Sequence, residues 1–210
     1  MHYEPCIGVV LAGGKSTRMG KDKASLTIKN CSNDRREFTM LSYSQQLLEQ
    51  VGINTVVVSG KSSGLKDQIP NIGPLGGIYS AIKAYPAQAM LIIPVDMPLV
   101  TINCLARLKQ VGELSAKACH YGGEPLPLYL PINAFVEVFF VKHFEHLNSS
   151  KIINDRPCNE LKGPSIMSLL KEVPTQRLAT PKDQSLFNAN TPEQWQYAKT
   201  QLMRRQNHYA

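Results

Sequence analysis

The sequence predicts an α/β fold in which helices cover both faces of a mainly parallel sheet. Short apolar runs alternate with helix-like segments through the first two thirds of the chain. The apolar runs are continuous, which is typical of strands buried on both faces of a sheet. Such alternation favours βαβ units with right-handed crossovers. After residue 115 the pattern changes, so we expect a mixed sheet in a three-layer arrangement.

The expected elements follow one another without a repeat or a long linker, so residues 1–210 are expected to form one domain. We expect Gly52 to end the first long helix, and Thr101 and Thr191 to precede later helices as N-caps. The expected strands cover residues 6–11, 55–58, 90–95, 116–121 and 126–130. The expected helices cover residues 38–51, 76–85, 101–111, 132–147, 165–171 and 192–203. Two polar stretches, 29–37 and 148–163, have the composition of surface loops.

Composition narrows the class of protein. Apolar residues make up 43% and charged residues 19% of the chain, as in ordinary soluble domains. No apolar stretch approaches the roughly 18 residues that span a bilayer, and no signal peptide is evident, so we expect a cytoplasmic protein without membrane contact. Five cysteines without a Cys-x-x-Cys pair argue against a disulfide framework and a structural zinc site. The net charge of +7 is spread along the chain without interleaved aromatics, so nucleic-acid binding is not expected.

The most informative segment is the loop after the first apolar run. Gly13 and Gly14 end that run, and Arg18 and Lys23 follow among further lysines. Glycines at the carboxyl end of a buried strand let backbone N–H groups approach a ligand, while the basic side chains supply positive charge. The spacing matches neither a P-loop nor a dinucleotide-binding turn. The segment therefore predicts a phosphate-binding loop of another kind, and hence a nucleotide substrate.

Two further strand ends carry candidate ligand groups. Asp67 precedes a group of glycines, Gly73, Gly76 and Gly77, where backbone donors at a helix start can face an anion. A tight turn into the helix explains these glycines equally well. Asp96 directly follows the third apolar run, where its carboxylate could hold magnesium together with substrate phosphates, or only cap the next turn. Because ligands of open sheets sit beyond the carboxyl ends of strands, the three ends together predict one site.

These segments resemble the molybdenum cofactor guanylyltransferases, which are MobA-like nucleotidyltransferases with a Rossmann-like, GT-A-type fold. The resemblance covers nearly the whole chain. It is carried by Leu11-Ala-Gly-Gly14 through Lys23, by Asp67 with residues 73–78, and by residues 94–98, 124–126 and 187–193. It implies transfer of GMP from GTP to the terminal phosphate of molybdopterin, with Mg²⁺ and release of pyrophosphate. It further implies a nucleotide-binding part of about residues 1–112, an acceptor-binding part of about 113–210, and transient contact with molybdoenzymes or their chaperones.

The resemblance also implies roles for single residues. Backbone contacts to the guanine base and ribose are implied for Leu11, Ala12 and Gly13. Contacts to the triphosphate are implied for Gly14, Arg18 and Lys23, with Arg18, Lys23 and Asp96 as the catalytic residues. Asp67 would hydrogen-bond the nucleotide, and the base pocket would be lined by Gly73, Pro74 and Leu75. Asp96 would bind the magnesium ion, and the pterin would face Asn188 and Asn190.

The chain departs from the family pattern in several places. Ser59, a candidate nucleotide contact, stands where relatives carry asparagine, and Glu193-Gln194 replaces the commoner Glu-Asp. The stretches 29–37 and 148–163 have no counterpart in the pattern. Other readings therefore stay open: a relative that uses CTP, one with a sugar-phosphate acceptor, or a non-catalytic cofactor-binding protein. Lys23 and Asp96 argue against the last reading, because binding alone does not require a placed metal ligand.

Overall fold

The computed structural model describes residues 4–13, 23–29, 37–60, 64–69, 72–148 and 163–207. Its strands are β1 (Ile7–Leu11), β2 (Thr27–Lys29), β3 (Glu37–Thr39), β4 (Val56–Ser59), β5 (Ala89–Pro94), β6 (Ala118–Tyr121), β7 (Leu128–Pro131) and β8 (Thr175–Leu178). Its helices are the 3₁₀ turn η1 (Lys23–Ser25) and the α-helices α1 (Met40–Gln50), α2 (Pro74–Ala84), α3 (Ile102–Ser115), α4 (Ala134–Asn148), α6 (Ile166–Glu172) and α7 (Pro192–Asn207).

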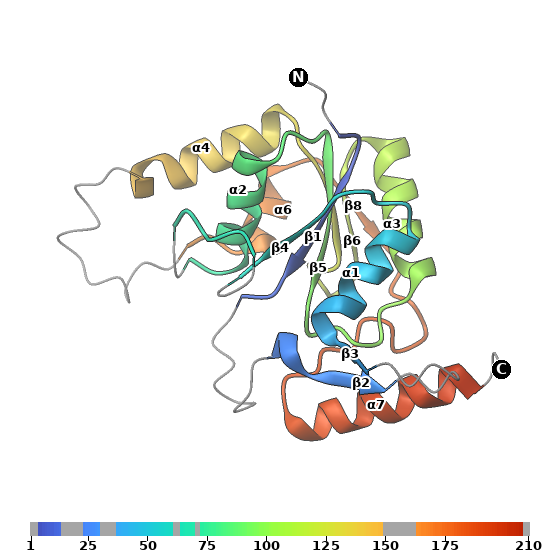
Figure 1. The fold of residues 1–210 in the computed structure, drawn as a ribbon. Helices are drawn as coiled ribbons and strands as arrows, with labels where there is room; N and C mark the ends of the chain where they lie inside the picture. Colours follow the sequence, from blue (N-terminus) through green and yellow to red (C-terminus); the bar gives the residue numbers. More distant parts are fainter. Residues whose placement is uncertain are drawn as a thin grey trace.

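A six-stranded mixed sheet in the order β4-β1-β5-β7-β6-β8 forms the centre of the molecule (Figure 1). β1 pairs in parallel with both β4 and β5, and β6 pairs in parallel with β8. Only β7 runs against its neighbours, β5 and β6. The mainly parallel, mixed sheet predicted from the alternation of apolar runs is therefore confirmed. As a consequence of this pairing, the carboxyl ends of β1, β4, β5, β6 and β8 all lie at one edge of the sheet.

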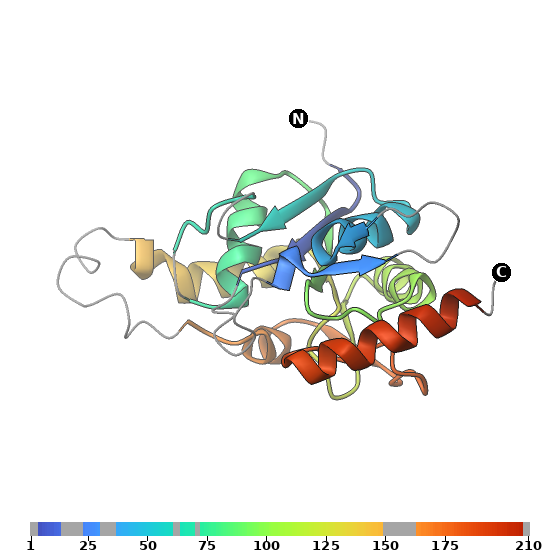
Figure 2. The same ribbon diagram turned by 60° about the horizontal axis from the view of Figure 1, so that its bottom comes forward.

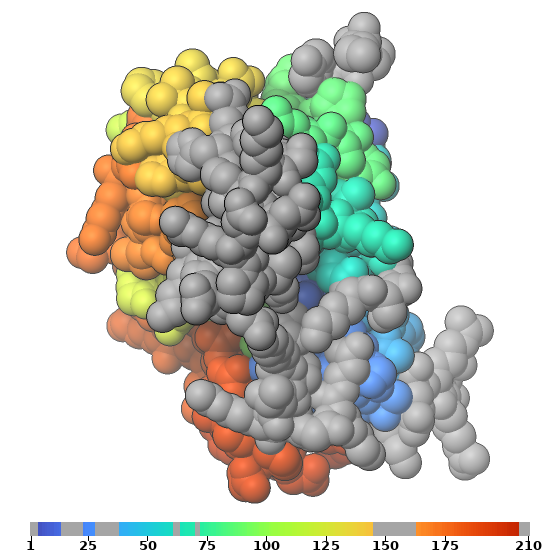
Figure 3. Space-filling view, turned by 90° about the vertical axis from the view of Figure 1, so that its left-hand side faces the viewer, coloured from blue at the N-terminus to red at the C-terminus, as the bar shows by residue number. Residues whose placement is uncertain are grey.

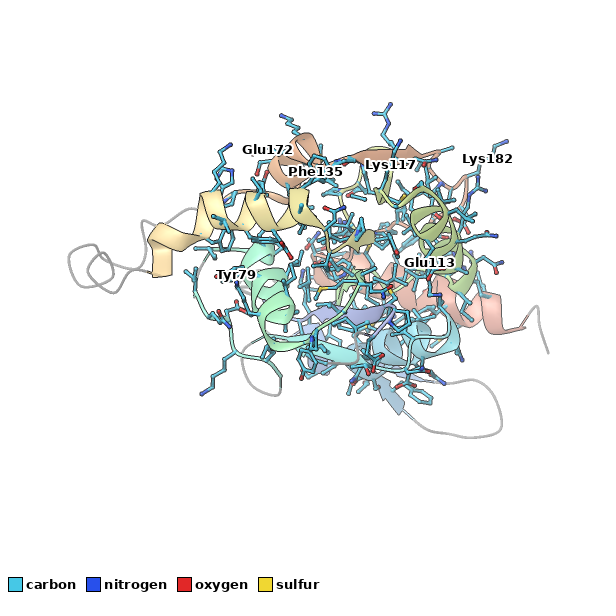
Figure 4. The ribbon with its side chains drawn as sticks, turned by 90° about the horizontal axis from the view of Figure 1, so that it is seen from above. Tyr79, Glu113, Lys117, Phe135, Glu172 and Lys182 are labelled. Atoms are coloured by element: carbon cyan, nitrogen blue, oxygen red, sulfur yellow. The ribbon has the colours of Figure 1, made fainter. Side chains whose placement is uncertain are left out.

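Two layers of helices cover the sheet. One core cluster joins α1, α3 and α7 to one face, and a second joins α2, α4 and α6 to the other, which makes three layers (Figures 1 and 2). On the second face, the ring centroids of Tyr79 on α2 and Phe144 on α4 lie 4.9 Å apart. Glu172 of α6 accepts hydrogen bonds from Lys142 and His143 of α4. Figure 4 shows Tyr79 and Glu172 on either side of α4.

Local sequence explains where most helices begin and end. The Thr101 hydroxyl accepts a hydrogen bond from the Cys104 backbone N–H at 3.2 Å, so the predicted N-cap of α3 is confirmed. Gly52 follows α1 with a φ of +83°, a conformation that favours glycine. The predicted start of the second helix at residue 76 is wrong. α2 begins at Pro74, because proline fits the first helical position, and Gly76 and Gly77 lie inside the helix.

Three short strands were not predicted from the sequence. β2 and β3 form a separate antiparallel hairpin at the two ends of the expected loop 29–37. Figures 1 and 2 both place this hairpin beside α7. β8 lies at the edge of the large sheet and pairs only with β6. Among the residues the structure describes, no helix is long and apolar enough to cross a membrane.

Candidate functional site

The candidate site lies at the sheet edge where the carboxyl ends of β1, β4 and β5 meet. Side chains or backbone groups of the sequence-predicted set follow each of these three strands, namely Gly13, Asp67 and Asp96. The chain returns to this edge twice, at η1 and in the segment before α7. In the space-filling view of Figure 3, α2 (green) lies at the upper right, α4 and α6 (yellow and orange) lie at the left, and α7 (red) lies at the bottom.

Lys23 joins two residues that are far away in the sequence. Its Nζ atom donates a hydrogen bond to the Asp96 carboxylate at 3.0 Å and another to the Asn190 side-chain oxygen at 2.7 Å. The side chains of Lys23 and Asp96 are 17% and 25% exposed, so the ion pair is only partly screened by water. The structure thus brings together three of the residues singled out in the sequence, across 73 and 167 positions of the chain.

The segment before α7 is also attached to Asp96 through the backbone. The Ala189 N–H donates to the Asp96 carbonyl oxygen at 2.9 Å. Ala189 itself is buried, whereas Asn188 is half-buried and Asn190 is exposed at the site. Asp96 therefore has two contacts in this region, one from its side chain to Lys23 and one from its backbone to Ala189.

Ser59 and Asp67 form a second group at the end of β4. Ser59 is 3% exposed, and its hydroxyl donates to the Asp67 carboxylate at 3.1 Å. Burial raises the pKa of Asp67 above its ordinary value, and the hydrogen bond from Ser59 opposes this shift. The buried Ser59 hydroxyl thus orients the Asp67 carboxylate. The sequence marked Ser59 as a candidate nucleotide contact at a position where relatives carry asparagine, and it gave no sign of the contact with Asp67.

Close packing of α2 against β4 explains two glycines of this region. A Cβ atom added at Gly77 would overlap the Ser59 hydroxyl oxygen and would lie 3.1 Å from the Ser59 Cβ. Gly73 precedes α2 with a φ of +80° and is exposed at the helix N-terminus, next to Pro74. The Leu75 side chain is fully buried in the core, so only its backbone can face a ligand at the site.

The loop after β1 continues the sheet pairing before it leaves the described residues. The Leu11 carbonyl accepts from the Val95 N–H at 3.1 Å, and the Ala12 N–H donates to the Ser59 carbonyl at 2.8 Å. The next residue, Gly13, lies against Gly60, where an added Cβ would come within 2.8 Å of the Gly13 nitrogen. The two loops therefore pack backbone to backbone. Gly14 and Arg18, both predicted to hold phosphates, lie outside the described residues.

Comparison with protein families matches residues 8–150 to the MobA-like NTP transferase domain. The chain is 34% identical to a molybdenum cofactor guanylyltransferase from Xanthomonas euvesicatoria pv. vesicatoria (strain 85-10), across 91% of this chain and 93% of the relative. It is 28% identical to a probable molybdenum cofactor guanylyltransferase from Peptoclostridium acidaminophilum, across 89% of this chain and 85% of the relative.

Solved structures share the fold at low sequence identity. Rv0371c from Mycobacterium tuberculosis H37Rv superposes with a TM-score of 0.60 at 18% identity, across 95% of this chain and all of that one. A nucleotidyl transferase from Methanothermobacter thermautotrophicus superposes with a TM-score of 0.61 at 14% identity, across 96% and 99% of the two chains. Both likenesses concern the fold, and they agree with the mixed sheet and its two helical layers.

Proposed function

Since the chain belongs to the family of MobA-like NTP transferases, we propose that it transfers GMP from GTP to the terminal phosphate of molybdopterin. The family membership makes the protein a nucleotidyltransferase enzyme with a role in molybdenum cofactor biosynthesis. The choice of GTP as the nucleotide and molybdopterin as the acceptor goes beyond what family membership shows. This choice is supported by the similarity to relatives named molybdenum cofactor guanylyltransferase and by the contacts of Lys23.

The observation that carries the proposal is the position of the Lys23 ammonium group. It lies between Asp96, at the end of β5, and Asn190, in the segment before α7. In an open sheet this is where a ligand is expected, beyond the carboxyl ends of the strands. A cation at this position can neutralise the charge of a triphosphate and of the pyrophosphate that leaves. Asn190, on the other side of the ammonium group, can contact the acceptor.

The proposed reaction is a single displacement at phosphorus. An oxygen of the acceptor's terminal phosphate forms a bond to the α-phosphorus of GTP, and the bond from that phosphorus to the α,β-bridging oxygen breaks. Pyrophosphate leaves with the bonding electron pair. Because the attacking oxygen is already anionic at neutral pH, the reaction requires no general base. The protein then accelerates the transfer by holding the two substrates in line and by placing positive charge near the developing negative charge.

Asp96 suits a magnesium ion by its chemistry. Magnesium prefers oxygen ligands and needs only one or two protein carboxylates when phosphates and waters complete its shell. The Asp96 carboxylate provides such oxygens, and the Asn190 amide oxygen lies on the other side of the Lys23 ammonium group. Among the described residues no group of three or more histidine, cysteine or acidic side chains could hold a metal instead. When bound, the ion would neutralise phosphate charge.

Replacing Lys23 or Asp96 tests the proposed roles. We expect Lys23→Met and Asp96→Asn each to lower the rate of GMP transfer about 10²- to 10³-fold, as the loss of a transition-state contact does elsewhere. Lys109→Met is the matched control, because Lys109 also forms an ion pair with an acidic residue, Glu113 at 2.9 Å, on α3 (Figure 4). That variant should keep normal turnover. Near-normal transfer by Lys23→Met would contradict the assignment.

The nucleotide is tested by calorimetric titration with GTP, CTP and ATP, each with and without magnesium. Magnesium-dependent binding of GTP alone is the expected result. Preference for CTP would instead make the protein a cytidylyltransferase of the same family. Folded protein that binds none of the three nucleotides would overturn the catalytic assignment and favour a cofactor-binding role.

A further inference from the structure

We propose that Gln194 is a positioning residue for the transfer reaction, because it fixes the backbone of Asn190 where the Asn190 side chain meets Lys23. This inference rests on the proposed function of the Lys23 site. The sequence marked Gln194 only as a departure from the family pattern, outside the glycine loop and outside the segment of Asp96. The structure assigns it a set of contacts that lead directly to the site.

The Gln194 side chain caps the start of α7 and reaches past it. Its Oε1 atom accepts hydrogen bonds from the Asn190 N–H at 2.7 Å and from the Thr191 N–H at 3.1 Å. In return, the Thr191 hydroxyl accepts the Gln194 N–H at 3.3 Å. This reciprocal arrangement is a capping box, for which Thr191-x-x-Gln194 is the sequence signature. In addition to the usual bonds, the glutamine here holds the residue before the N-cap.

The anchor of this arrangement is rigid. α7 packs against the core through Trp195, Ala198 and Leu202, which are 7%, 0% and 6% exposed. Gln194 lies in the first turn of the same helix, directly before Trp195. The position of its side-chain oxygen is therefore set by the packed helix, whereas Asn190 itself is exposed and has no such burial.

Through Asn190, the contacts of Gln194 extend to Lys23, where we place the reaction. The Asn190 side-chain oxygen accepts from Lys23 Nζ at 2.7 Å, and Lys23 also binds the Asp96 carboxylate. The Ala189 N–H donates to the Asp96 carbonyl at 2.9 Å. The two-residue segment is thus held on one side by Asp96 and on the other by Gln194. Loss of the second contact leaves the Asn190 backbone without its bond to Gln194, so the backbone is then held through Ala189 and the side chain through Lys23.

Glutamine supplies this contact without a charge. A helix N-terminus generally favours an acidic side chain at this position, because the helix dipole is positive there. A carboxylate next to Asn190 would add negative charge close to where we place the phosphates of both substrates. The neutral amide keeps the two hydrogen bonds to the backbone and avoids that repulsion. A misplacement of about 1 Å at a reacting centre can cost on the order of 10² in rate, so a capping contact can matter for turnover.

The test is a double-mutant cycle that combines Gln194→Met with Asn190→Ala in the whole chain. Gln194→Met keeps the side-chain length but removes the oxygen acceptor. We expect it to lower kcat/KM for molybdopterin about 10-fold, with a smaller change in the affinity for GTP. In an Asn190→Ala background the same replacement should have no further effect, because Gln194 acts through Asn190. Equal losses in both backgrounds would show a general structural role and overturn the proposal.

Two further variants separate positioning from simple helix capping. Thr191→Val removes the hydroxyl that accepts the Gln194 N–H but leaves both bonds to the Gln194 oxygen. It should lower the melting temperature about as much as Gln194→Met while kcat/KM for molybdopterin stays near the wild-type value. Gln194→Glu keeps the acceptor but adds a negative charge, so it should keep the wild-type melting temperature while kcat/KM for molybdopterin falls, because the carboxylate repels the phosphates. A Thr191→Val variant as slow as Gln194→Met contradicts the assignment.

Amide hydrogen exchange makes the test independent of the substrate. The Asn190 N–H should exchange faster in Gln194→Met than in the wild type, and it should be unchanged in Thr191→Val. Unchanged exchange in Gln194→Met overturns the inference even if the wild type transfers GMP. If the wild type instead shows no transfer to molybdopterin, the proposed function fails, and the exchange result still decides whether Gln194 orders Asn190.

Discussion

Gly77 lies in α2 against the end of β4, and its replacement by alanine should destabilise the protein through Ser59. The added Cβ would overlap the Ser59 hydroxyl oxygen and lie 3.3 Å from the Leu11 Cδ2 atom. Ser59 is 3% exposed and cannot turn toward solvent without moving the strand. Its hydroxyl also donates to Asp67. The replacement therefore pushes on a buried side chain that holds a candidate nucleotide-binding carboxylate.

Two opposing effects set the magnitude. Alanine is more favourable than glycine in a helix interior by about 1 kcal/mol. Overpacking of a filled site costs about 1–3 kcal/mol. The net effect of Gly77→Ala is then a loss of roughly 0–2 kcal/mol in the free energy of unfolding. In a Ser59→Ala background the overlapping oxygen is absent, so the same replacement should be neutral or should stabilise by up to about 1 kcal/mol. The sign of the effect depends on one atom.

Urea unfolding of the wild type, Gly77→Ala, Ser59→Ala and the double variant at constant pH measures this coupling. The midpoint should fall in Gly77→Ala and should not fall further when Ser59→Ala is already present, with an unchanged dependence on urea concentration. Nucleotide affinity should fall along with stability in Gly77→Ala, because Ser59 orients Asp67. The reasoning is refuted if Gly77→Ala lowers the midpoint equally in both backgrounds.

Three further predictions concern the core and the titrating groups. Burial raises the pKa of Asp67, so the stability of the wild type falls as the pH rises through that pKa. Asp67→Asn can still accept the hydrogen bond from Ser59, so its melting temperature should exceed that of the wild type at pH 7. Below about pH 3.9, where the carboxyl is protonated, the two melting temperatures should be equal. Gly112→Ala, inside α3, would overlap the buried Tyr129 ring; overpacking of about 1–3 kcal/mol is offset by about 1 kcal/mol from the helix preference for alanine, so urea unfolding should show a net loss of roughly 0–2 kcal/mol with unchanged nucleotide affinity. Burial raises the pKa of Cys6 to about 12, so iodoacetamide at pH 8 should label this thiol only after unfolding, as peptide mapping by mass spectrometry would report.

Continuous apolar runs made the central strands predictable. β1 and β5 are buried along nearly their whole length, and the sequence shows this directly. β8 has no such run, because it is an edge strand that pairs only with β6 and leaves Arg177 exposed. The start of α2 was placed two residues too late because Gly76 and Gly77 were interpreted as the glycines at which the helix begins. Glycine is needed at both positions because the helix packs closely there, Gly76 against Ile72 just before the helix and Gly77 against Ser59 of β4.

The sequence allowed us to predict which residues form the candidate site but not which of them contact one another. Loops at strand ends indicated Lys23 and Asp96, because charge and strand direction can be read locally. Asn190 came only from the family resemblance, and its contact with Lys23 spans 167 positions. Gln194 could have been found from the capping-box spacing after Thr191, but that spacing says nothing about Asn190. Contacts between distant segments arise from the packed fold, so only the structure reveals them.

The partial exposure of the Lys23–Asp96 pair suits the role that we propose for it. Both side chains remain partly open to water, so water can solvate either group once the other has turned away. Separating them therefore costs little, which is a requirement for any residue that must turn from a protein partner to a substrate. Asp96 and Asn190 lie on different segments, which are joined by the Ala189 backbone and by the Lys23 ammonium group. A nucleotide that draws Lys23 toward its phosphates would then release the Asn190 side chain for the acceptor, while Gln194 keeps the Asn190 backbone in place.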